Sequence, residues 1–329
     1  MRTPPGVARA ALGVLLTASL TALLSSCGGS SGKPTGTPPP THRHRVPTTP
    51  ATTTPSTAPT HGGMAATATK VLTFIVENHS QTQMQAGMPY LSHLAQRYAY
   101  ASDYSAITHP SLPNYLAIAG GSTFGVADDA YPSTNAVKVG PATSVFDQAL
   151  ASGHTAKTYA ESMPGNCVLT SSGLYAVKHN PWAYFDAGRA NCLKYDVPSG
   201  TPTSGALASD VANGTLPDVG MVIPNLCNDA HDCSLSTADS WLQSWLPSIL
   251  SGPDFTSGQL VVVITADEDN HSQNNHVLTV VLDAASQGGR TVSAPLNHYS
   301  LSRLYSQIIA SNPLGQARTA PDMLAAFGL

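Results

Sequence analysis

Three continuous apolar runs constrain the fold of this chain more than any other feature. They are Lys70–Val76, Val219–Ile223 and residues 259–265, and all three are rich in β-branched residues. None shows the alternation of polar and apolar residues that a half-exposed strand would have, so each is expected to be buried on both faces. Segments with helical spacing lie between them. The pattern therefore predicts an α/β domain whose central, mainly parallel sheet carries helices on both faces.

The segments between these runs carry the other secondary-structure signals. Apolar residues spaced three and four apart predict helices, and short β-rich runs predict two further strands. The small, polar segment 199–214 is predicted to be a surface loop. The expected helices cover residues 89–98, Ser111–Gly120, 144–151, 236–250 and 300–309, and the two expected strands cover residues 155–160 and 276–282.

Residues 1–26 have the features of an export signal. A basic start is followed by an apolar run over residues 10–24, which is shorter than a membrane span. The run ends in Ser25-Ser26-Cys27, which resembles a bacterial lipobox. We expect cleavage before Cys27, lipid on its thiol, and a mature protein on the extracellular face of the cell membrane or released from it. An ordinary secretory signal and an uncleaved anchor are the alternatives.

A tether and one folded domain are expected to follow. Residues 27–69 are mostly Pro, Thr, Ser and Gly, a composition that cannot bury enough apolar surface to fold. Residues 70–329 have the length of one α/β domain, which would carry the chemistry, and we expect it to be a monomer. The net charge of −4 gives no support for nucleic acid as a partner.

Four cysteines remain besides Cys27, and an even number in an exported chain favours two disulfides. Three pairings are possible, of which we prefer the local one, Cys167 with Cys192 and Cys227 with Cys233. Cys227, His231 and Cys233 could instead bind zinc, although no fourth ligand is evident nearby.

Polar residues follow each of the three buried strands. In open α/β sheets the carboxyl ends of the strands form the site, so these residues are expected to meet. Clustered carboxylates repel one another unless a cation neutralises them, and one or two divalent metal ions would do so. Oxygen ligands favour Ca²⁺, Mg²⁺ or Mn²⁺, whereas added histidines favour Zn²⁺ or Fe. The residues are Glu77 and Asn78, then Asn225, Asn228 and Asp229, and finally Asp267, Glu268 and Asp269.

Ser111 is the candidate nucleophile. It stands at the start of the apolar helix expected from Ser111 to Gly120, where backbone N–H groups favour an anion. A serine there could attack phosphorus, with a metal supplying the activation that a free hydroxyl lacks. The alternative is a serine that merely caps the helix.

Five stretches of the chain, in this order, resemble the bacterial phosphoesterase family of secreted acid phosphatases and phospholipases C. That family belongs to the alkaline-phosphatase-like superfamily. Two positions depart from it: Ala266 stands where relatives often have an aromatic residue, and His79 where they often have Arg. The stretches are Glu77-Asn78-His79, His109-Pro110-Ser111-Leu112-Pro113-Asn114-Tyr115, Lys178-His179-Asn180-Pro181-Trp182, residues 224–232 and Asp267-Glu268-Asp269.

The resemblance implies a role for each matching residue. Ser111 would be the nucleophile, and His231 would bind phosphate or protonate the leaving oxygen, oriented by Asp232 or Asp229. His179 is expected on the rim of the site, beside Lys178. The implied metal ligands are Glu77, Asn78, Asp267 and Glu268, the implied phosphate contact is Asn114, and Asn228 and Asp229 are implied at the active site. We expect these last three residues to bind substrate together with His109, His179 and Asn225.

The predicted function is metal-dependent hydrolysis of phosphate monoesters through a phosphoserine on Ser111. The partner would be a phosphorylated small molecule or a phospholipid head group such as a phosphoinositide. A phospholipase C-type diesterase, a metal-free serine esterase and a surface lipoprotein that only binds phospho-ligands are the alternatives. Residues 70–329, the expected folded domain, lack the Gly-x-Ser-x-Gly elbow of the serine esterases.

Overall fold

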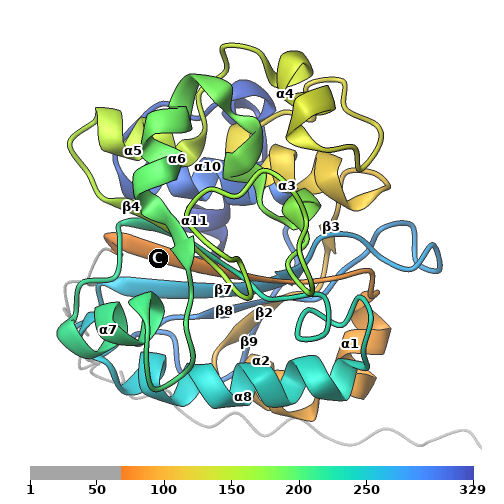
Figure 1. Cartoon of the computed structure of the whole chain (residues 1–329). Helices are drawn as coiled ribbons and strands as arrows, with labels where there is room; N and C mark the ends of the chain where they lie inside the picture. Colours follow the sequence, from red (N-terminus) through yellow and green to blue (C-terminus); the bar gives the residue numbers. More distant parts are fainter. Residues whose placement is uncertain (1–67) are drawn as a thin grey trace, which may run out of the picture. The chain divides into compact units, whose positions relative to one another are not determined.

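An eight-stranded sheet runs through the centre of residues 68–329, the part of the chain that the computed structural model describes (Figure 1). Its strand order is β5-β4-β6-β1-β7-β8-β2-β9. Neighbouring strands are parallel except on either side of β8, which runs opposite to the others. A separate parallel pair joins β3 and β10. The strands are β1 (Lys70–Val76), β2 (Ala99–Ala101), β3 (Tyr104–Ser105), β4 (Ala156–Ala160), β5 (Asp196–Pro198), β6 (Val219–Ile223), β7 (Leu260–Ala266), β8 (Thr279–Leu282), β9 (Arg290–Val292) and β10 (Leu296–Asn297).

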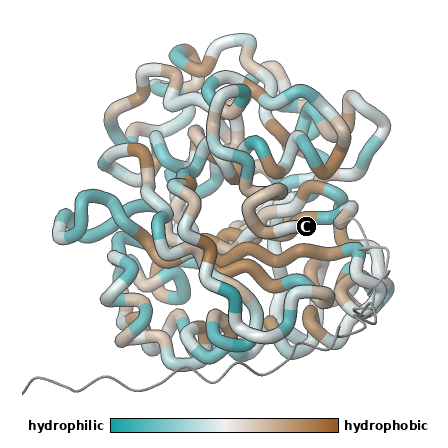
Figure 2. Tube along the Cα trace, turned by 180° about the vertical axis from the view of Figure 1, so that it is seen from behind, coloured by the Kyte–Doolittle hydropathy of each residue, from teal (hydrophilic) through white to brown (hydrophobic). Residues whose placement is uncertain are grey.

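The middle of the sheet is fully buried. Every residue of β6 and β7 is buried, as is all of β1 beyond Lys70, and these strands form the brown, hydrophobic band of Figure 2. Polar side chains in this layer are paired with one another. Thr73 accepts a hydrogen bond of 2.6 Å from the Tyr305 hydroxyl, and the hydroxyls of Thr265 and Thr279 lie 2.7 Å apart. Continuous apolar strands thus mark a sheet that is covered on both faces.

Helices cover the two faces of the sheet in separate groups (Figure 1). The first group, α1, α2, α7, α8 and α9, packs together beneath β7 and β8, and the second, α3, α5 and α10, packs over β1, β4 and β6. The helices are α1 (Gln81–Gly87), α2 (Pro89–Arg97), α3 (Ser111–Gly120), α4 (Pro132–Val139), α5 (Val145–Ala151), α6 (Arg189–Tyr195), α7 (Ala206–Asn213), α8 (Leu235–Ser251), α9 (Pro253–Thr256), α10 (His298–Ile308) and α11 (Met323–Phe327), with 3₁₀ turns η1 (Val177–His179), η2 (Pro181–Tyr184), η3 (Asp186–Gly188) and η4 (Gly315–Arg318).

The predicted fold class is confirmed, and two local predictions are wrong. The segment 199–214 is not only a loop, because it contains α7, in which Leu207 and Val211 lie four residues apart and are buried on one face. The strand expected from residue 276 begins only at Thr279, because His276 forms an isolated bridge with Ser105 and directs its ring to the Ser102 carbonyl. Short polar segments of this kind give little periodic signal.

Both expected local disulfides are present in the structure, Cys167 with Cys192 and Cys227 with Cys233. The zinc alternative is wrong, because two of its three ligands are bonded to each other. Within residues 68–329, no helix combines the length and the apolar character needed to cross a bilayer. The predicted signal, Cys27 and nearly all of the predicted tether lie outside the described residues.

Candidate active site

The site is built where parallel strands end. Because β4, β6, β1 and β7 run in the same direction, the residues that follow them lie at one edge of the sheet. Backbone hydrogen bonds join these ends: the Glu77 amide donates to the Asp229 carbonyl at 2.8 Å, and the Asn78 amide donates to Asp267 Oδ1 at 3.0 Å. The sequence prediction that these carboxylates meet agrees with this geometry.

Ser111 points into this edge. It is the first residue of α3, its side chain is buried, and its Oγ donates a hydrogen bond of 3.0 Å to Glu77 Oε2. Asn78 donates to the same carboxylate oxygen at 3.1 Å. A buried serine held against a buried carboxylate is more than a helix cap, because α3 has Pro110 at the cap position and no side-chain cap bond.

The helix start offers fewer amides to an anion than its position suggests. The Leu112 amide donates to Asp129 Oδ1 at 2.9 Å, and Pro113 has no N–H. Among the first three residues of α3, this leaves the amide of Ser111 to face a phosphoryl oxygen. The remaining contacts to such a group must therefore come from side chains.

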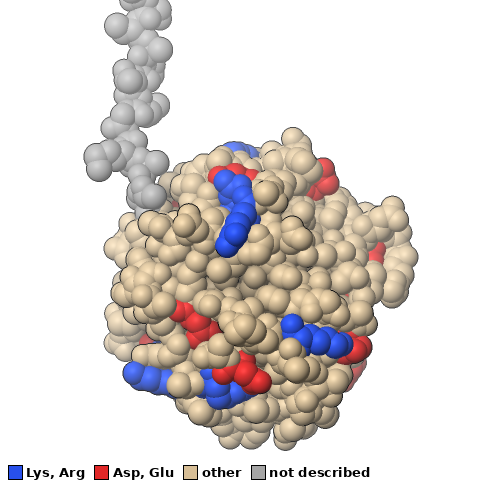
Figure 3. Space-filling model, turned by 90° about the horizontal axis from the view of Figure 1, so that it is seen from above, with Lys and Arg blue, Asp and Glu red and all other residues tan. Residues whose placement is uncertain are grey.

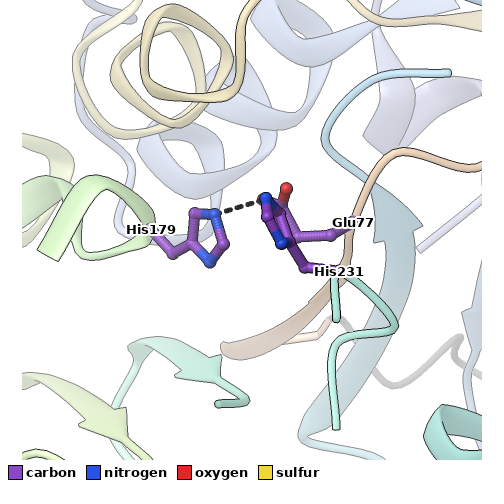
Figure 4. A group of neighbouring side chains, drawn as sticks. All are labelled: Glu77, His179 and His231. Carbon is purple, nitrogen blue, oxygen red and sulfur yellow. Dashed lines mark ion pairs between the residues drawn. The ribbon is translucent and has the colours of Figure 1, made fainter. Parts of the chain in front are cut away.

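His179 lies at the centre of the site, so its expected place on the rim is wrong. It ends the 3₁₀ turn η1 and is 1% exposed, because Tyr115 of α3 stacks on its ring with centroids 5.2 Å apart. Its Nε2 lies 3.0 Å from Glu77 Oε1 (Figure 4). Its Nδ1 lies 3.1 Å from Asp229 Oδ2. The imidazole therefore bridges two buried carboxylates.

The charges of this bridge determine its ionisation. Burial alone would raise the pKa of Glu77, but the positive charges of His179 and Lys178 outweigh it and lower that pKa to about 2. Burial alone would lower the pKa of His179, but Glu77 and Asp229 raise it to about 9. In the absence of another cation, an ionised Glu77 and an imidazolium thus face each other.

Two further carboxylates, Asp267 and Glu268, would bring more negative charge into the site than these cations can neutralise. Asp267 is completely buried, and its Oδ2 has no hydrogen-bond partner. Burial, followed by repulsion from Glu77 and Glu268, holds the pKa of Asp267 well above its usual range. Burial and the charges of Glu77 and Asp129 raise the pKa of Glu268 to about 8. A divalent cation would take the place of these protons, so the residues present fit a metal ion.

Two overlapping donor sets could hold that ion. Ligand atoms of Glu77, His179 and His231 all lie within 4.8 Å of one another, and Figure 4 shows the three side chains converging. The set expected from the sequence adds Asn78, Asp267 and Glu268. Asn78 donates to Glu77 Oε2 through its side chain and to Asp267 Oδ1 through its backbone amide. Glu77 belongs to both sets. The first favours Zn²⁺ or Fe, and the second favours Mg²⁺, Ca²⁺ or Mn²⁺.

The amide of Asn114 and the ring of His109 meet Glu268. Asn114 Nδ2 lies 3.2 Å from Glu268 Oε2, while its Oδ1 accepts from the backbone amides of Ile107 and Thr108. His109 Nδ1 lies 3.1 Å from the same Glu268 oxygen, and its Nε2 lies 3.3 Å from Asp269. Both residues thus anchor the segment before Ser111 to the acidic end of β7.

The loop after β6 is held by a residue that the sequence analysis missed. Glu161, directly after β4, accepts from the Asn225 amide, from Asn228 Nδ2 and from Trp241 Nε1, all at 3.0 Å. Asn225 Oδ1 in turn accepts from the amides of Cys227 and Asn228. The side chains of Asn225 and Asn228, expected to bind substrate, therefore fold the loop. Glu161 directly follows the strand predicted at residues 155–160, and this position is the signal by which the sequence could have identified it.

His231 stands at the mouth of the site. Its Nδ1 lies 2.7 Å from Asp232 Oδ1, and its Nε2 lies 3.3 Å from Lys178 Nζ. A charged lysine has only donors, so Nε2 accepts and the ring proton on Nδ1 faces Asp232. The backbone of His231 is fixed by Asp229 Oδ1, which accepts from its amide at 2.8 Å. The expected neighbours of His231 are thus in place.

Two other histidines support the site from behind. His298, the first residue of α10, is buried and lies 2.6 Å from the Asp267 carbonyl through Nε2, and burial lowers its pKa to about 4. His79, at the position where relatives often have Arg, turns its ring to the Glu77 carbonyl at 2.5 Å. Both rings contact backbone carbonyls beside candidate metal ligands.

Comparisons with known proteins agree on one family. The model of the Phosphoesterase family matches residues 66–310. The phosphatidylinositol-3-phosphatase of Mycobacterium tuberculosis is 32% identical over 275 residues, which cover 81% of this chain and 86% of that one. The phosphate-repressible acid phosphatase of Penicillium chrysogenum is 30% identical over 223 residues, which cover 64% of this chain but only 52% of the fungal protein.

Solved structures show the same fold at low sequence identity. An alkaline phosphatase superfamily protein from Vibrio parahaemolyticus is 12% identical with a TM-score of 0.51, over 77% of this chain and 70% of that one. A lipoteichoic acid synthase from Listeria monocytogenes is 11% identical with a TM-score of 0.50, over 79% and 76%. The predicted alkaline-phosphatase-like architecture is thereby confirmed.

Proposed function

Because this chain belongs to the phosphoesterase family and is therefore a hydrolase of phosphoric esters, we propose that it cleaves phosphate monoesters through metal-assisted attack by Ser111. One observation supports this most directly: the buried Ser111 Oγ lies 3.0 Å from Glu77, at an edge that gathers more carboxylates than its cations neutralise. A protein that only bound phosphate would have no use for a buried hydroxyl oriented by a carboxylate.

Ser111 is proposed to form the covalent intermediate. Its Oγ bonds to phosphorus while the bond from phosphorus to the leaving oxygen breaks, and its proton leaves along the hydrogen bond to Glu77 Oε2. Glu77 orients the hydroxyl. A divalent ion held by Glu77 with Asn78 and Asp267, or by Glu77 with His179 and His231, would supply charge for the phosphoryl oxygens. Water then breaks the bond between Oγ and phosphorus and releases phosphate.

His231 is proposed to bind the phosphoryl group or, once its Nε2 is protonated and released from Lys178, to give that proton to the leaving oxygen. It is partly exposed at the mouth, where a leaving group would depart, and Asp232 fixes its ring. Asp229 holds both the His231 backbone and the ring of His179. The loop that Glu161 anchors thus carries the residues nearest to the leaving group.

The names of the relatives support phosphate monoesters as the substrates of this chain, since the two described above are named as phosphatases. A phosphoinositide head group or a phosphorylated small molecule is the substrate class that we propose. A phospholipase C-type diesterase is the second candidate. Two disulfides are typical of an exported protein, and they support the proposed location outside the cell, with lipid on Cys27 as the anchor.

The test is hydrolysis of p-nitrophenyl phosphate and of its bis-ester by the full chain, with and without EDTA, beside Ser111→Ala. We expect metal-dependent monoester turnover that falls at least about a thousandfold in Ser111→Ala. Ser133→Ala, at an exposed serine of α4, is the matched control and should leave turnover unchanged. Turnover that survives both EDTA and Ser111→Ala would rule out the mechanism, and tight phosphate binding without turnover would favour the binding protein.

A further inference from the structure

Lys178 is a cation fixed at the mouth of a site that is rich in carboxylates. Burial alone would lower the pKa of Lys178, but the charges of Glu77, Asp129 and Asp267 outweigh it and raise that pKa, and the charge of Lys178 in turn helps to lower the pKa of Glu77. Charged side chains are sparse in this protein, at 10% of the residues, and most of the face seen in Figure 3 is uncharged. Apart from the imidazolium of His179, which is buried at the centre of the site, Lys178 therefore supplies a positive charge at the mouth.

The position of Lys178 is set from two sides. Its Nζ donates to Asp129 Oδ2 at 3.1 Å, and the other oxygen of Asp129 accepts from the Leu112 amide, next to the nucleophile. Nζ also lies 3.3 Å from His231 Nε2. Asp129 therefore ties the lysine to the start of α3, so that the ammonium group keeps a fixed position relative to Ser111.

The ammonium group retains capacity for a ligand. Its side chain is 20% exposed, and a lysine has three donors, of which Asp129 and His231 take two. Within residues 68–329 no other group takes the third donor, which can therefore meet an anionic oxygen of a group attached to Ser111. In the backbone of α3, by contrast, the Leu112 amide already donates to Asp129 and Pro113 has no N–H, so neither residue can donate to the phosphoryl group.

Substrate charge separates the two ester classes. Near neutral pH a phosphate monoester carries about two negative charges, because its second pKa lies near 6, whereas a diester carries one. In a diester, the second ester group replaces the oxygen that would bear the extra charge. A fixed cation at that oxygen therefore strengthens monoester binding and contributes little to the diester.

We propose that Lys178, held by Asp129, is the residue that makes this site prefer phosphate monoesters over diesters. The inference rests on the proposed phosphoesterase function. Lys178 contacts substrate in this scheme and Asp129 is a positioning residue. Loss of a charged hydrogen bond of this kind corresponds to about a 10- to 100-fold change in affinity.

The experiment measures kcat/KM of the full chain for p-nitrophenyl phosphate and for bis-p-nitrophenyl phosphate, together with inhibition by inorganic phosphate. The variants are Lys178→Met, Lys178→Gln and Lys178→Arg. The matched control is Lys138→Met, because Lys138 forms a similar but exposed pair with the neighbouring Asp128, at 3.5 Å. Unfolding temperatures show whether each variant is folded, and Lys178→Gln gives the same test should Lys178→Met fail to fold.

We expect Lys178→Met to lower the monoester-to-diester ratio about 10- to 100-fold and to weaken phosphate inhibition by a similar factor. Diester turnover should change less than about threefold, Lys178→Arg should restore much of the ratio, and Lys138→Met should match the parent chain. Equal losses on both substrates, or a parent chain that prefers the diester, would overturn the inference and leave the phosphoesterase function standing. A parent chain that hydrolyses neither substrate would instead overturn the proposed function, and the inference with it.

Discussion

Replacing Asp196 with asparagine should remove a large part of the pH dependence of folding. Asp196 begins β5, is completely buried, and accepts hydrogen bonds from Thr158 Oγ1 at 2.7 Å and from Asn180 Nδ2 at 2.8 Å. Burial raises its pKa to about 7, and the hydrogen bonds from Thr158 and Asn180, with the charge of Arg189, only partly offset that effect. The folded chain therefore holds a proton on Asp196 that the unfolded chain has lost.

The size of the effect follows from that difference. From pH 5 to pH 7 the unfolded carboxyl is mostly ionised and the folded one is mostly protonated, so the free energy of unfolding falls as pH rises. Each pH unit in this window costs about 1.4 kcal/mol, so that the two units lower stability by about 3 kcal/mol. Above the folded pKa the contribution becomes constant. The amide of the Asp196→Asn variant cannot ionise, so the variant should lack this decline.

Urea unfolding of both chains at pH 5, 6, 7 and 8 provides the assay. The difference in unfolding free energy between the parent and Asp196→Asn should shift by about 3 kcal/mol between pH 5 and pH 8, in favour of the variant at high pH. Constant effects of the substitution on packing cancel in this comparison. Two parallel curves would show that Asp196 is ionised in the folded protein at pH 5, and would refute the reasoning.

The remaining predictions concern the site. His231→Gln should reduce turnover of an alkyl phosphate at least about a hundredfold more than turnover of p-nitrophenyl phosphate, whose good leaving group needs no proton; equal losses in kinetic assays would assign His231 to phosphate binding. Glu161→Ala leaves three hydrogen-bond donors without their charged partner and should cost about 3 kcal/mol, or about 6–12 °C in Tm by calorimetry, with reduced kcat/KM. The control Asp186→Ala removes an exposed ion pair with Arg189 and should cost less than about 1 kcal/mol. An unchanged Tm in Glu161→Ala would show that water accepts the hydrogen bonds that the Glu161 carboxylate accepts in the parent chain.

The central sheet could be predicted from the sequence because its strands are continuous apolar runs. Such runs need no knowledge of their neighbours to be recognised, and the residue after each run falls at the carboxyl edge of the sheet whatever the strand order. This is why the meeting of Glu77, Asp229 and Asp267 was predictable. The local disulfide between Cys227 and Cys233 was also within reach, since the two cysteines are only six positions apart.

Features that depend on strand order or on irregular backbone were beyond the sequence. Glu161 binds Asn225 and Asn228 because β4 pairs with β6, although more than 60 residues separate them along the chain. His179 is buried because a 3₁₀ turn places its ring on Tyr115, and such turns have no periodic signature. Both cases require tertiary contacts that local patterns do not encode.

The place of β1 in the sheet has a consequence for how the chain folds. β1 is the first strand of the described chain, yet the residues of β6 and β7 that pair with it follow about 150 and 190 positions later. During synthesis its six buried residues have no partner until most of the chain exists, so folding is expected to be slow, and this apolar segment is exposed to aggregation in the meantime. Glu77 and Ser111 likewise reach their final environment only when β7 has paired. Enzyme activity during refolding would therefore report completion of the central sheet and would lag behind the formation of helices.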